Sequence, residues 1–191
     1  RAMVRETHLS PADLIWPIFV MAGEDSHEPV SSMPGVSRHT VDRLPALAAT
    51  AHKLGIPAIC IFPYTDPALK TEDCKEAWNP DNLSNRAIRA IKDAVPDIMV
   101  MTDIALDPYN INGHDGIVRD GEIINDETVA ALVKMGEAQA QSGADILGPS
   151  DMMDARIGAL RAMLEQNSFH NVSILSYSAK FSSAFYGPFR D

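Results

Sequence analysis

The stretch Asn125–Leu147, NDETVAALVKMGEAQAQSGADIL, contains the unit that decides the fold. Its apolar residues first recur with helical spacing, then Gly143 stands where a helix C-cap is expected, and the short apolar run 144–147 follows. A helix that leads through a glycine into a buried strand is half of a βαβ unit, and the chain repeats this order along its length. The helical face consists of Val129, Leu132, Val133, Gly136 and Ala140.

Short apolar runs that are rich in Ile and Val and do not alternate are typical of parallel strands covered on both faces. Pro17 fits poorly into the first of them, because proline is disfavoured in a central strand. Each run is separated from the next by helical periodicity. The predicted strands are 14–20, 58–62, 98–102, 144–147 and 172–176.

Three further helices are predicted from apolar spacing at residues 44–54, 88–95 and 157–164. Gly55 stands before a strand in the same way as Gly143, and Asn125 and Ser150 are plausible N-caps. No Gly-x-Gly-x-x-Gly follows a strand, so a dinucleotide-binding sheet has no specific support.

Alternating strands and helices favour an α/β (β/α)8 TIM barrel, which typically needs about 250 residues. The 191 residues hold about five strand–helix units. We therefore expect residues 1–191 to form a single domain that is a partial barrel, from which the C-terminal strands are missing.

Acidic residues dominate the charge, since 26 Asp and Glu against 16 Lys and Arg give a formal net charge of −10 at pH 7. Such a surface repels phosphate backbones and anionic lipid, so neither nucleic acid nor a membrane is an expected partner. No apolar run approaches the ~18 residues of a membrane span, and the N-terminus lacks signal-peptide features. Cys60, a predicted core residue, and Cys74 suggest no disulfide framework, so a reducing cytoplasm is the expected compartment.

Polar residues follow the predicted strands, and in a barrel the carboxyl ends of all strands meet at one rim. Lys180 follows the fifth strand among small residues, in SYSAK (176–180). Partial desolvation there would favour the neutral amine, which can attack a carbonyl carbon and form an imine. A solvated surface lysine is the alternative, because most lysines are exposed.

Two other strand-end segments offer candidate substrate contacts. Arg190 ends the aromatic loop that begins at Phe185, and its planar guanidinium suits a carboxylate, although a surface charge is equally consistent. The segment Ser150–Asp154 is most simply a helix start capped by Ser150, with Met152 and Met153 in the core. Alternatively, Asp151 points into the barrel mouth.

The third strand leads into an acidic segment with one imidazole, formed by Asp103, Asp107, His114 and Asp115. Carboxylates favour hard cations such as Mg²⁺, and the lack of a nearby cysteine excludes a thiolate zinc site in this loop. Loop-capping aspartates with a hydrogen-bonded histidine are an equally good interpretation.

Taken together, several segments resemble the porphobilinogen synthase (5-aminolevulinate dehydratase) family. Each is weak or moderate alone, but they occur in order over nearly the whole chain. They are SMPGV (32–36), DIALDPYNINGHDG (103–116), NDETV (125–129), PSDMMD (149–154) and SYSAKFSSAFYGPFRD (176–191).

The resemblance implies condensation of two 5-aminolevulinate molecules to porphobilinogen, with loss of water, through lysine Schiff bases and without an organic cofactor. It implies that Lys180 binds one substrate as an imine, that Arg190 binds its carboxylate, and that Asp103 lies near the reacting amines. On the same basis Ser150, Asp151 and Phe185 are expected to contact substrate. A homo-oligomer, an octamer in the family, is implied, as is the plastid stroma instead of the cytoplasm for a plant or algal source.

The sequence departs from the family pattern in its metal ligands and its extent. Zinc-dependent members carry cysteines where Ala105, Asp107 and Asp115 stand, so no catalytic zinc is expected, but Mg²⁺ or a monovalent cation, with Asp107 and Asp115 as candidate ligands. The second imine-forming lysine of the family, in a Val-Lys-Pro-Gly stretch, and part of the N-terminal arm are absent. We expect the chain alone to be inactive.

Two alternatives remain open at this point. A class I aldolase barrel also uses a lysine at a strand end, but it does not require the acidic third-strand loop or PSDMMD. An inactive fragment or structural subunit is the non-enzymatic alternative, because only one of the two lysines is present.

Overall fold

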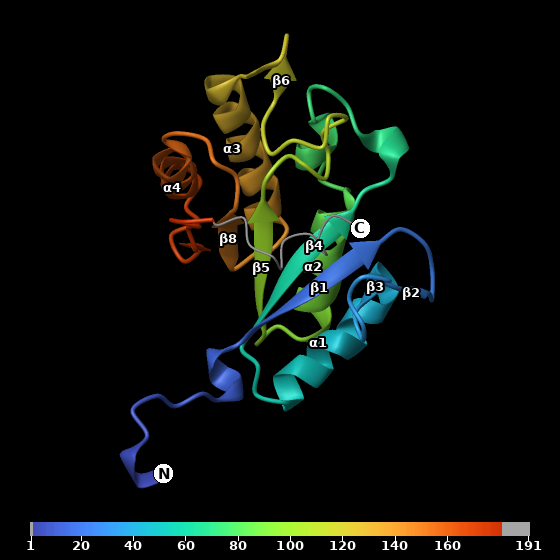
Figure 1. The fold of residues 1–191 in the computed structure, drawn as a ribbon, viewed down its shortest axis with the longest axis vertical. Helices are drawn as coiled ribbons and strands as arrows, with labels where there is room; N and C mark the ends of the chain where they lie inside the picture. The colour runs from blue at the N-terminus through green and yellow to red at the C-terminus, as the bar shows by residue number, and fades with distance from the viewer. Residues whose placement is uncertain (1, 181–191) are drawn as a thin grey trace.

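The computed structural model describes residues 2–180, which are built around a seven-stranded sheet. The five predicted strands are confirmed: they lie side by side in chain order, each parallel to the next, and a helix precedes each strand after the first (Figure 1). This is part of a (β/α)8 barrel. The strands are β1 (Ile15–Met21), β4 (Ala58–Tyr64), β5 (Met99–Ile104), β8 (Ile146–Pro149) and β9 (Ser173–Ile174).

The four predicted helices are also present, and they bury the apolar faces that their spacing predicts. Leu44, Ala48 and Ala51 of the first helix are fully buried, whereas Leu54 lies beyond its last residue and is exposed. Cys60 is buried in the sheet, as predicted. The helices are α1 (Leu44–Lys53), α2 (Leu83–Ala94), α3 (Asn125–Gln141) and α4 (Arg156–Gln166).

Gly55 and Gly143 end α1 and α3 in the left-handed region, with φ of +79° and +104°. Residues with a Cβ rarely adopt this conformation, so glycine lets the chain leave each helix and enter the next strand at once. Both predicted helix ends are therefore confirmed.

The two predicted N-caps are wrong. Asn125 is the first residue of α3, and its side chain accepts a hydrogen bond from Asp154 N (2.8 Å) instead of capping the helix. Ser150 lies six residues before α4, which begins after Ala155 in the left-handed region (φ +65°). Two methionines lie between Ser150 and α4. Met153 is buried as predicted, but Met152 is 57% exposed.

Short elements that were not predicted complete the fold. β3 pairs with β1 only over Phe19–Met21, so Pro17 lies where β1 has its one partner, β4, and this explains how proline is tolerated. No helix in residues 2–180 is long and apolar enough to cross a bilayer. The further strands are β2 (His27–Pro29), β3 (Ser37–Thr40), β6 (Val118–Arg119) and β7 (Glu122–Ile123), and the 3-10 helices are η1 (Ala2–Val4), η2 (Pro11–Asp13), η3 (Val41–Arg43), η4 (Pro67–Leu69) and η5 (Lys75–Trp78).

Gly148 lets β8 approach β5 closely at the position where polar chemistry begins. It pairs with Asp103, and a Cβ placed on Gly148 would lie 2.9 Å from the Thr102 carbonyl oxygen and against Cε of Met101. The methionine can rotate away, but the carbonyl belongs to the sheet backbone. The close spacing of β5 and β8 thus depends on residue 148 being a glycine, which has no side chain.

Gly148→Ala is expected to lower the unfolding free energy by about 1–3 kcal/mol, because the two strands must separate to admit the methyl group. Gly158→Ala provides the matched control: it lies in α4 with open space around its Cβ position, so it should gain up to ~1 kcal/mol from helix propensity. Urea unfolding of both variants measures the difference. Equal stabilities would contradict the close approach.

Candidate active site

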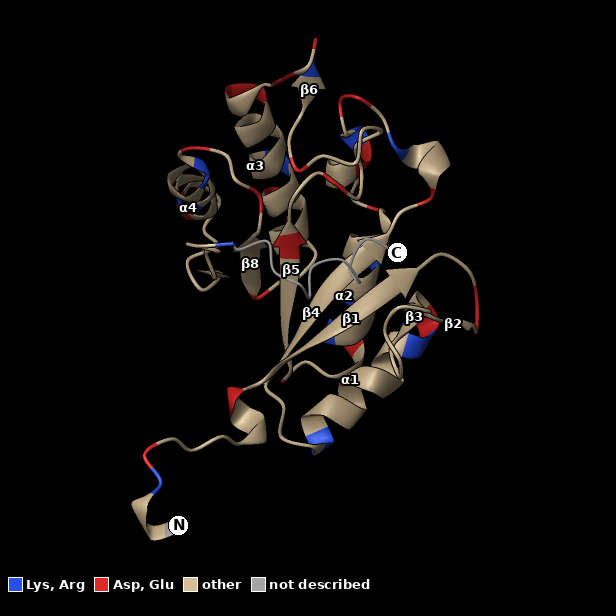
Figure 2. Ribbon diagram, in the orientation of Figure 1, with Lys and Arg blue, Asp and Glu red and all other residues tan. Residues whose placement is uncertain are grey.

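A cavity of about 560 Å³ opens at the carboxyl ends of the strands. Asp103 faces it from β5, whereas its neighbours Thr102 and Ile104 do not, as the alternation of a strand requires. Acidic residues mark the end of β5 and the loops beyond it (Figure 2). Phe19 and Phe62 are among the apolar lining residues. The polar lining consists of Arg38, Tyr64, Thr65, Lys70, Asp103, Asp107, Asp115, Ser150, Tyr177 and Lys180.

Lys180 lies in this cavity and is not a fully solvated surface lysine. Its Nζ donates a hydrogen bond to the Ser150 carbonyl oxygen at 2.9 Å and lies 3.4 Å from Asp115 Oδ2. The side chain is 23% exposed. The strand-end argument therefore placed the amine correctly, among acceptors and partly removed from water.

Asp103 is the most strongly desolvated carboxyl group that lines the cavity. Its Oδ1 is buried without a hydrogen-bond partner. Burial raises the pKa of Asp103 from 3.8 to about 7; hydrogen bonding by Ser150 and the charge of Lys180 oppose the shift, while Asp107 and Asp115 add to it. A carboxyl group of this kind is near half-protonation at neutral pH and can both accept and donate a proton.

Asp107 lies close enough to Asp115 to feel its charge. Burial, followed by the charge of Asp115, raises the pKa of Asp107 to about 6, and Lys180 opposes the shift. Both side chains line the cavity, as the predicted metal ligands would. Within residues 2–180, however, no group of three or more His, Cys, Asp or Glu side chains has an arrangement that could hold a metal ion.

His114 belongs to the structure of its own loop. Its Nδ1 accepts a hydrogen bond from Gly116 N (2.9 Å), and Asn110 Nδ2 donates to the Gly116 carbonyl oxygen (2.7 Å). The Leu106 amide also donates to the Asp115 carbonyl oxygen (3.2 Å). The hydrogen-bonded histidine, one of the two interpretations of this segment, is therefore the one the structure supports, and these bonds hold Asp115 toward the cavity.

The remaining predicted residues have different outcomes. Ser150 lines the cavity and is 7% exposed. Asp151 does not line it: the side chain is fully buried, Oδ1 accepts from Met153 N (2.8 Å), and Oδ2 lies 3.0 Å from Arg156 Nε. Burial raises the pKa of Asp151, and the Met153 amide and Arg156 oppose the shift. Phe185 and Arg190 lie outside the described residues.

Several cavity residues were not singled out from the sequence. Arg38 stacks over the Tyr64 ring at 4.5 Å from its centroid, but it comes from β3, a strand that the periodicity did not reveal. Lys70 comes from the long loop after β4. Tyr177 lies within SYSAK itself; burial, with the charges of Cys60 and Asp103, raises its pKa to about 12, so it is a neutral phenol at physiological pH. Its place two residues after an apolar run was the signal available for it.

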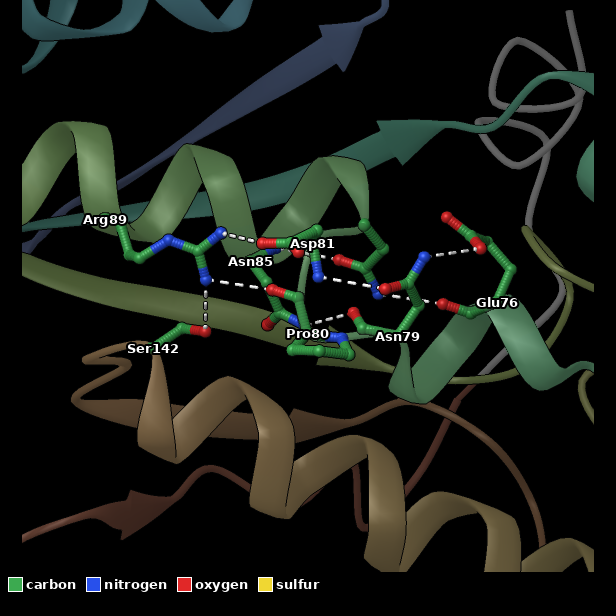
Figure 3. Close-up of polar contacts among 8 residues, drawn as sticks. Glu76, Asn79, Pro80, Asp81, Asn85, Arg89 and Ser142 are labelled. Atoms are coloured by element: carbon green, nitrogen blue, oxygen red, sulfur yellow. Dashed lines mark hydrogen bonds and ion pairs between the residues drawn. The ribbon is translucent and has the colours of Figure 1, made fainter.

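Hydrogen bonds hold the loop that carries Lys70 at two places. Thr71 N donates to the Tyr109 carbonyl oxygen (3.0 Å), which joins this loop to the one after β5. Further along, Arg89 Nη1 donates to the Pro80 carbonyl oxygen (2.9 Å) and to Ser142 Oγ (3.2 Å), and its Nη2 binds Asp81 (Figure 3). The loop is therefore tied to α2 and to the end of α3.

Comparisons with known proteins give one and the same family over the whole chain. The sequence model of the family Delta-aminolevulinic acid dehydratase matches residues 1–191. The delta-aminolevulinic acid dehydratase of Rhodobacter capsulatus is 56% identical over 191 residues, which is all of this chain and 58% of that protein. The enzyme of that name from Bradyrhizobium diazoefficiens is 53% identical, with 54% of its length covered.

A solved structure gives the same result in three dimensions. The delta-aminolevulinic acid dehydratase (porphobilinogen synthase) of Toxoplasma gondii ME49, crystallised with its reaction product porphobilinogen, superposes with a TM-score of 0.95 at 44% identity. The match covers 99% of this chain and 54% of that one. The chain thus spans about half the length of the relatives it matches.

Asp103→Asn is expected to change how stability depends on pH. Because the pKa of Asp103 is raised from 3.8 to about 7, the folded protein keeps a proton that the unfolded chain releases, so the stabilising effect is complete below about pH 4 and is lost as the pH rises to about 7. Asparagine has no such proton. Relative to the parent, the variant should therefore gain roughly 2–4 kcal/mol between about pH 4 and about pH 8.

Urea unfolding at a series of pH values measures this gain. Asp93→Asn, a change at an exposed carboxylate of α2, is the control and should leave the profile unchanged. Parallel profiles for the parent and Asp103→Asn would show that Asp103 is ionised throughout.

Proposed function

Because the chain belongs to the delta-aminolevulinic acid dehydratase family, we propose that the whole protein condenses two molecules of 5-aminolevulinate to porphobilinogen with loss of water. The observation that carries the proposal is the position of Lys180, whose amine lies in the cavity 2.9 Å from the Ser150 carbonyl oxygen. The solved relative from Toxoplasma gondii, described as bound to porphobilinogen, supports it. The reaction is a hydro-lyase step in tetrapyrrole synthesis.

The first covalent step is imine formation at Lys180. The ammonium group of Lys180, which is paired with Asp115, first gives up a proton. The neutral amine then attacks the ketone carbon of one substrate, and a carbinolamine forms; loss of water gives the imine. Once protonated, this imine withdraws electrons and acidifies the adjacent carbon, which prepares it for carbon–carbon bond formation. The Ser150 carbonyl oxygen accepts a hydrogen bond from the amine and so fixes where its nitrogen stands before attack.

Asp103 is the residue best suited to move protons in this step. Its pKa of about 7 lets it supply a proton to the departing hydroxyl group and recover one from substrate without a large energetic penalty. The positive charge of Lys180 lowers the pKa of Asp103, so the two groups interact electrostatically. Arg190 and Phe185 lie outside the described residues; both are proposed to contact substrate, and Arg190 to bind its carboxylate.

The aldolase alternative loses its basis, because the family match extends over residues 1–191 and includes the acidic loop. The other alternative, an inactive fragment, applies to these 191 residues and not to the whole protein. A second imine-forming lysine in a Val-Lys-Pro-Gly stretch does not occur in these 191 residues, so the condensation is proposed for the whole protein and not for this chain alone.

Borohydride reduction of the full-length protein with 5-aminolevulinate is expected to leave a secondary amine on the peptide that carries Lys180. Lys180→Ala should abolish this adduct and lower turnover by at least about 10³-fold, since it removes the nucleophile. Lys53→Ala, at an exposed lysine of α1, should leave both unchanged. Peptide mass spectrometry and a pyrrole assay measure the outcomes, and full activity in Lys180→Ala would refute the proposal.

The protein is further proposed to use Mg²⁺ or a monovalent cation and no catalytic zinc. Support comes from donor chemistry: Asp107 and Asp115 offer carboxylate oxygens, Ala105 offers no side-chain donor, and Cys60 and Cys74 are buried elsewhere. The pair Asp107 and Asp115 alone does not make a metal cage, and Lys180 already neutralises Asp115. No step of the proposed reaction therefore passes through a metal at this pair.

Removal and return of metal ions tests this part of the proposal. After dialysis against EDTA, Mg²⁺ or a monovalent cation is expected to restore any lost turnover, whereas Zn²⁺ is not. A zinc-selective chelator such as 1,10-phenanthroline should leave the turnover unchanged. Inactivation by phenanthroline that only Zn²⁺ reverses would contradict it.

Assembly and location complete the proposal. A homo-oligomer, an octamer as the resemblance implies, agrees with an N-terminal segment that extends from the sheet (Figure 1) and exposes Met3, Val4 and Leu9 by 75–99%. The compartment is the cytoplasm, or the plastid stroma for a plant or algal source, as for the relative from Chlamydomonas reinhardtii that is described as chloroplastic.

A further inference from the structure

The loop between β8 and α4 contains a buried ion pair that the proposed reaction does not use. The side chain of Asp151 is fully buried, and that of Arg156 is 14% exposed. Asp151 Oδ2 and Arg156 Nε are 3.0 Å apart but not aligned as a hydrogen bond, so each atom lacks a hydrogen-bond partner. Their attraction is therefore ionic. A charge in this position is costly unless its partner is present.

The pair closes the loop on itself through main-chain bonds. Asp151 Oδ1 accepts from Met153 N (2.8 Å), and Arg156 Nη1 donates to the Met153 carbonyl oxygen (2.8 Å). The backbone N–H and C=O groups of Met153 are thus each held by one member of the pair. The residue that follows, Asp154, is fixed in turn by Asn125 at the start of α3.

This closed loop adjoins two residues that line the cavity, Ser150 and Asp115. Ser150, whose carbonyl oxygen accepts from Lys180 Nζ, immediately precedes Asp151. Met153 packs against Gly116, since its Cε would lie 3.1 Å from a Cβ placed there, and Gly116 follows Asp115. The loop that the pair holds is therefore adjacent to two groups that contact the lysine amine, the Ser150 carbonyl oxygen and the Asp115 carboxylate.

We propose that Arg156 is a positioning residue: by neutralising Asp151 and binding the Met153 carbonyl oxygen, it fixes the Ser150 acceptor that orients Lys180. The proposal rests on the imine chemistry proposed above. Arg156 touches neither the cavity nor the reacting atoms, so its effect passes through the loop backbone. Its loss releases the acceptor and leaves a buried carboxylate unpaired.

In the full-length protein, Arg156→Met is expected to slow imine trapping at saturating 5-aminolevulinate by about 10- to 100-fold, because a displaced amine loses its attack geometry. The concentration that gives half-maximal trapping should change little, since the substrate's other contacts remain. Arg156→Lys, which keeps the charge but not the two-point contact, should recover part of the rate.

Arg161→Met is the matched control. Arg161 lies on the same helix and donates from Nη1 to the Val172 carbonyl oxygen (2.9 Å), but it supports the turn before β9 instead of the Ser150 loop. It should lower stability without slowing trapping in the folded protein. Urea unfolding establishes the folded fraction of each variant.

A measurement without substrate separates this proposal from the proposed function. Acetic anhydride in trace amounts labels exposed amines, and Lys92, also 23% exposed and paired with Asp145, serves as the internal reference for Lys180. Release of the loop should raise the labelling of Lys180 relative to Lys92 in folded Arg156→Met. An unchanged ratio, parental trapping in Arg156→Met, or an equal loss in Arg161→Met overturns the positioning role.

Two contingencies have defined outcomes. If Arg156→Met does not fold, Asp151→Asn combined with Arg156→Met removes both charges and is judged by the same criteria, with Arg156→Lys beside it. If the parental protein forms no imine at all, the proposed function fails, and the labelling ratio alone decides the positioning role.

Discussion

The hydrogen bond from Lys180 Nζ to the Ser150 carbonyl oxygen joins the segments that follow two neighbouring strands, and the proposed chemistry depends on it. β8 and β9 pair over only two residues each. Beyond them, Leu175 N donates to the Leu147 carbonyl oxygen (2.9 Å) and Tyr177 N to that of Pro149 (3.3 Å), so the backbones remain aligned past the strands. The lysine continues this series with its side chain. A helix-connected parallel sheet is what brings these segments, 30 residues apart in sequence, to one edge.

Charge balance is the second constraint on the cavity. Three carboxyl groups share it with three cationic side chains, Arg38, Lys70 and Lys180. Desolvation is the largest effect on the pKa of two of the carboxyl groups, Asp103 and Asp107. Asp115 forms an ion pair with Lys180, with Oδ2 at 3.4 Å from Nζ. The charge of Lys180 also favours the ionised forms of Asp103 and Asp107, but burial has the larger effect. The pKa values of both groups are therefore raised toward neutral pH. These two desolvated carboxyl groups can therefore exchange protons near the lysine amine.

The sequence predicted most of what depends on periodicity. Strand–helix order, the buried helical faces and the two glycine helix ends follow from local patterns, and strand order then placed Asp103 and Lys180 at one rim. Prediction from the sequence failed where tertiary contacts determine the local structure. Ser150 has the composition of an N-cap, but Ala155 takes a left-handed conformation and delays α4 to Arg156. Arg38 reaches the cavity from β3, whose four residues are too few and too polar to show a strand pattern.

Asp151 shows how such failures can be informative. Its place after β8 suggested a side chain in the barrel mouth, yet the carboxylate turns away from the cavity and is buried against Arg156. Local rules could not reveal this, because the partner lies beyond a loop whose shape they do not determine. A hydrophobic pair of similar volume would avoid the desolvation of two charges, so stability alone gives little reason for an ion pair here. What the pair does provide is a fixed backbone at Met153, between the acceptor that holds the lysine amine and the glycine that follows Asp115. The buried charges are best understood as the means by which the fold sets the position of its reactive nitrogen.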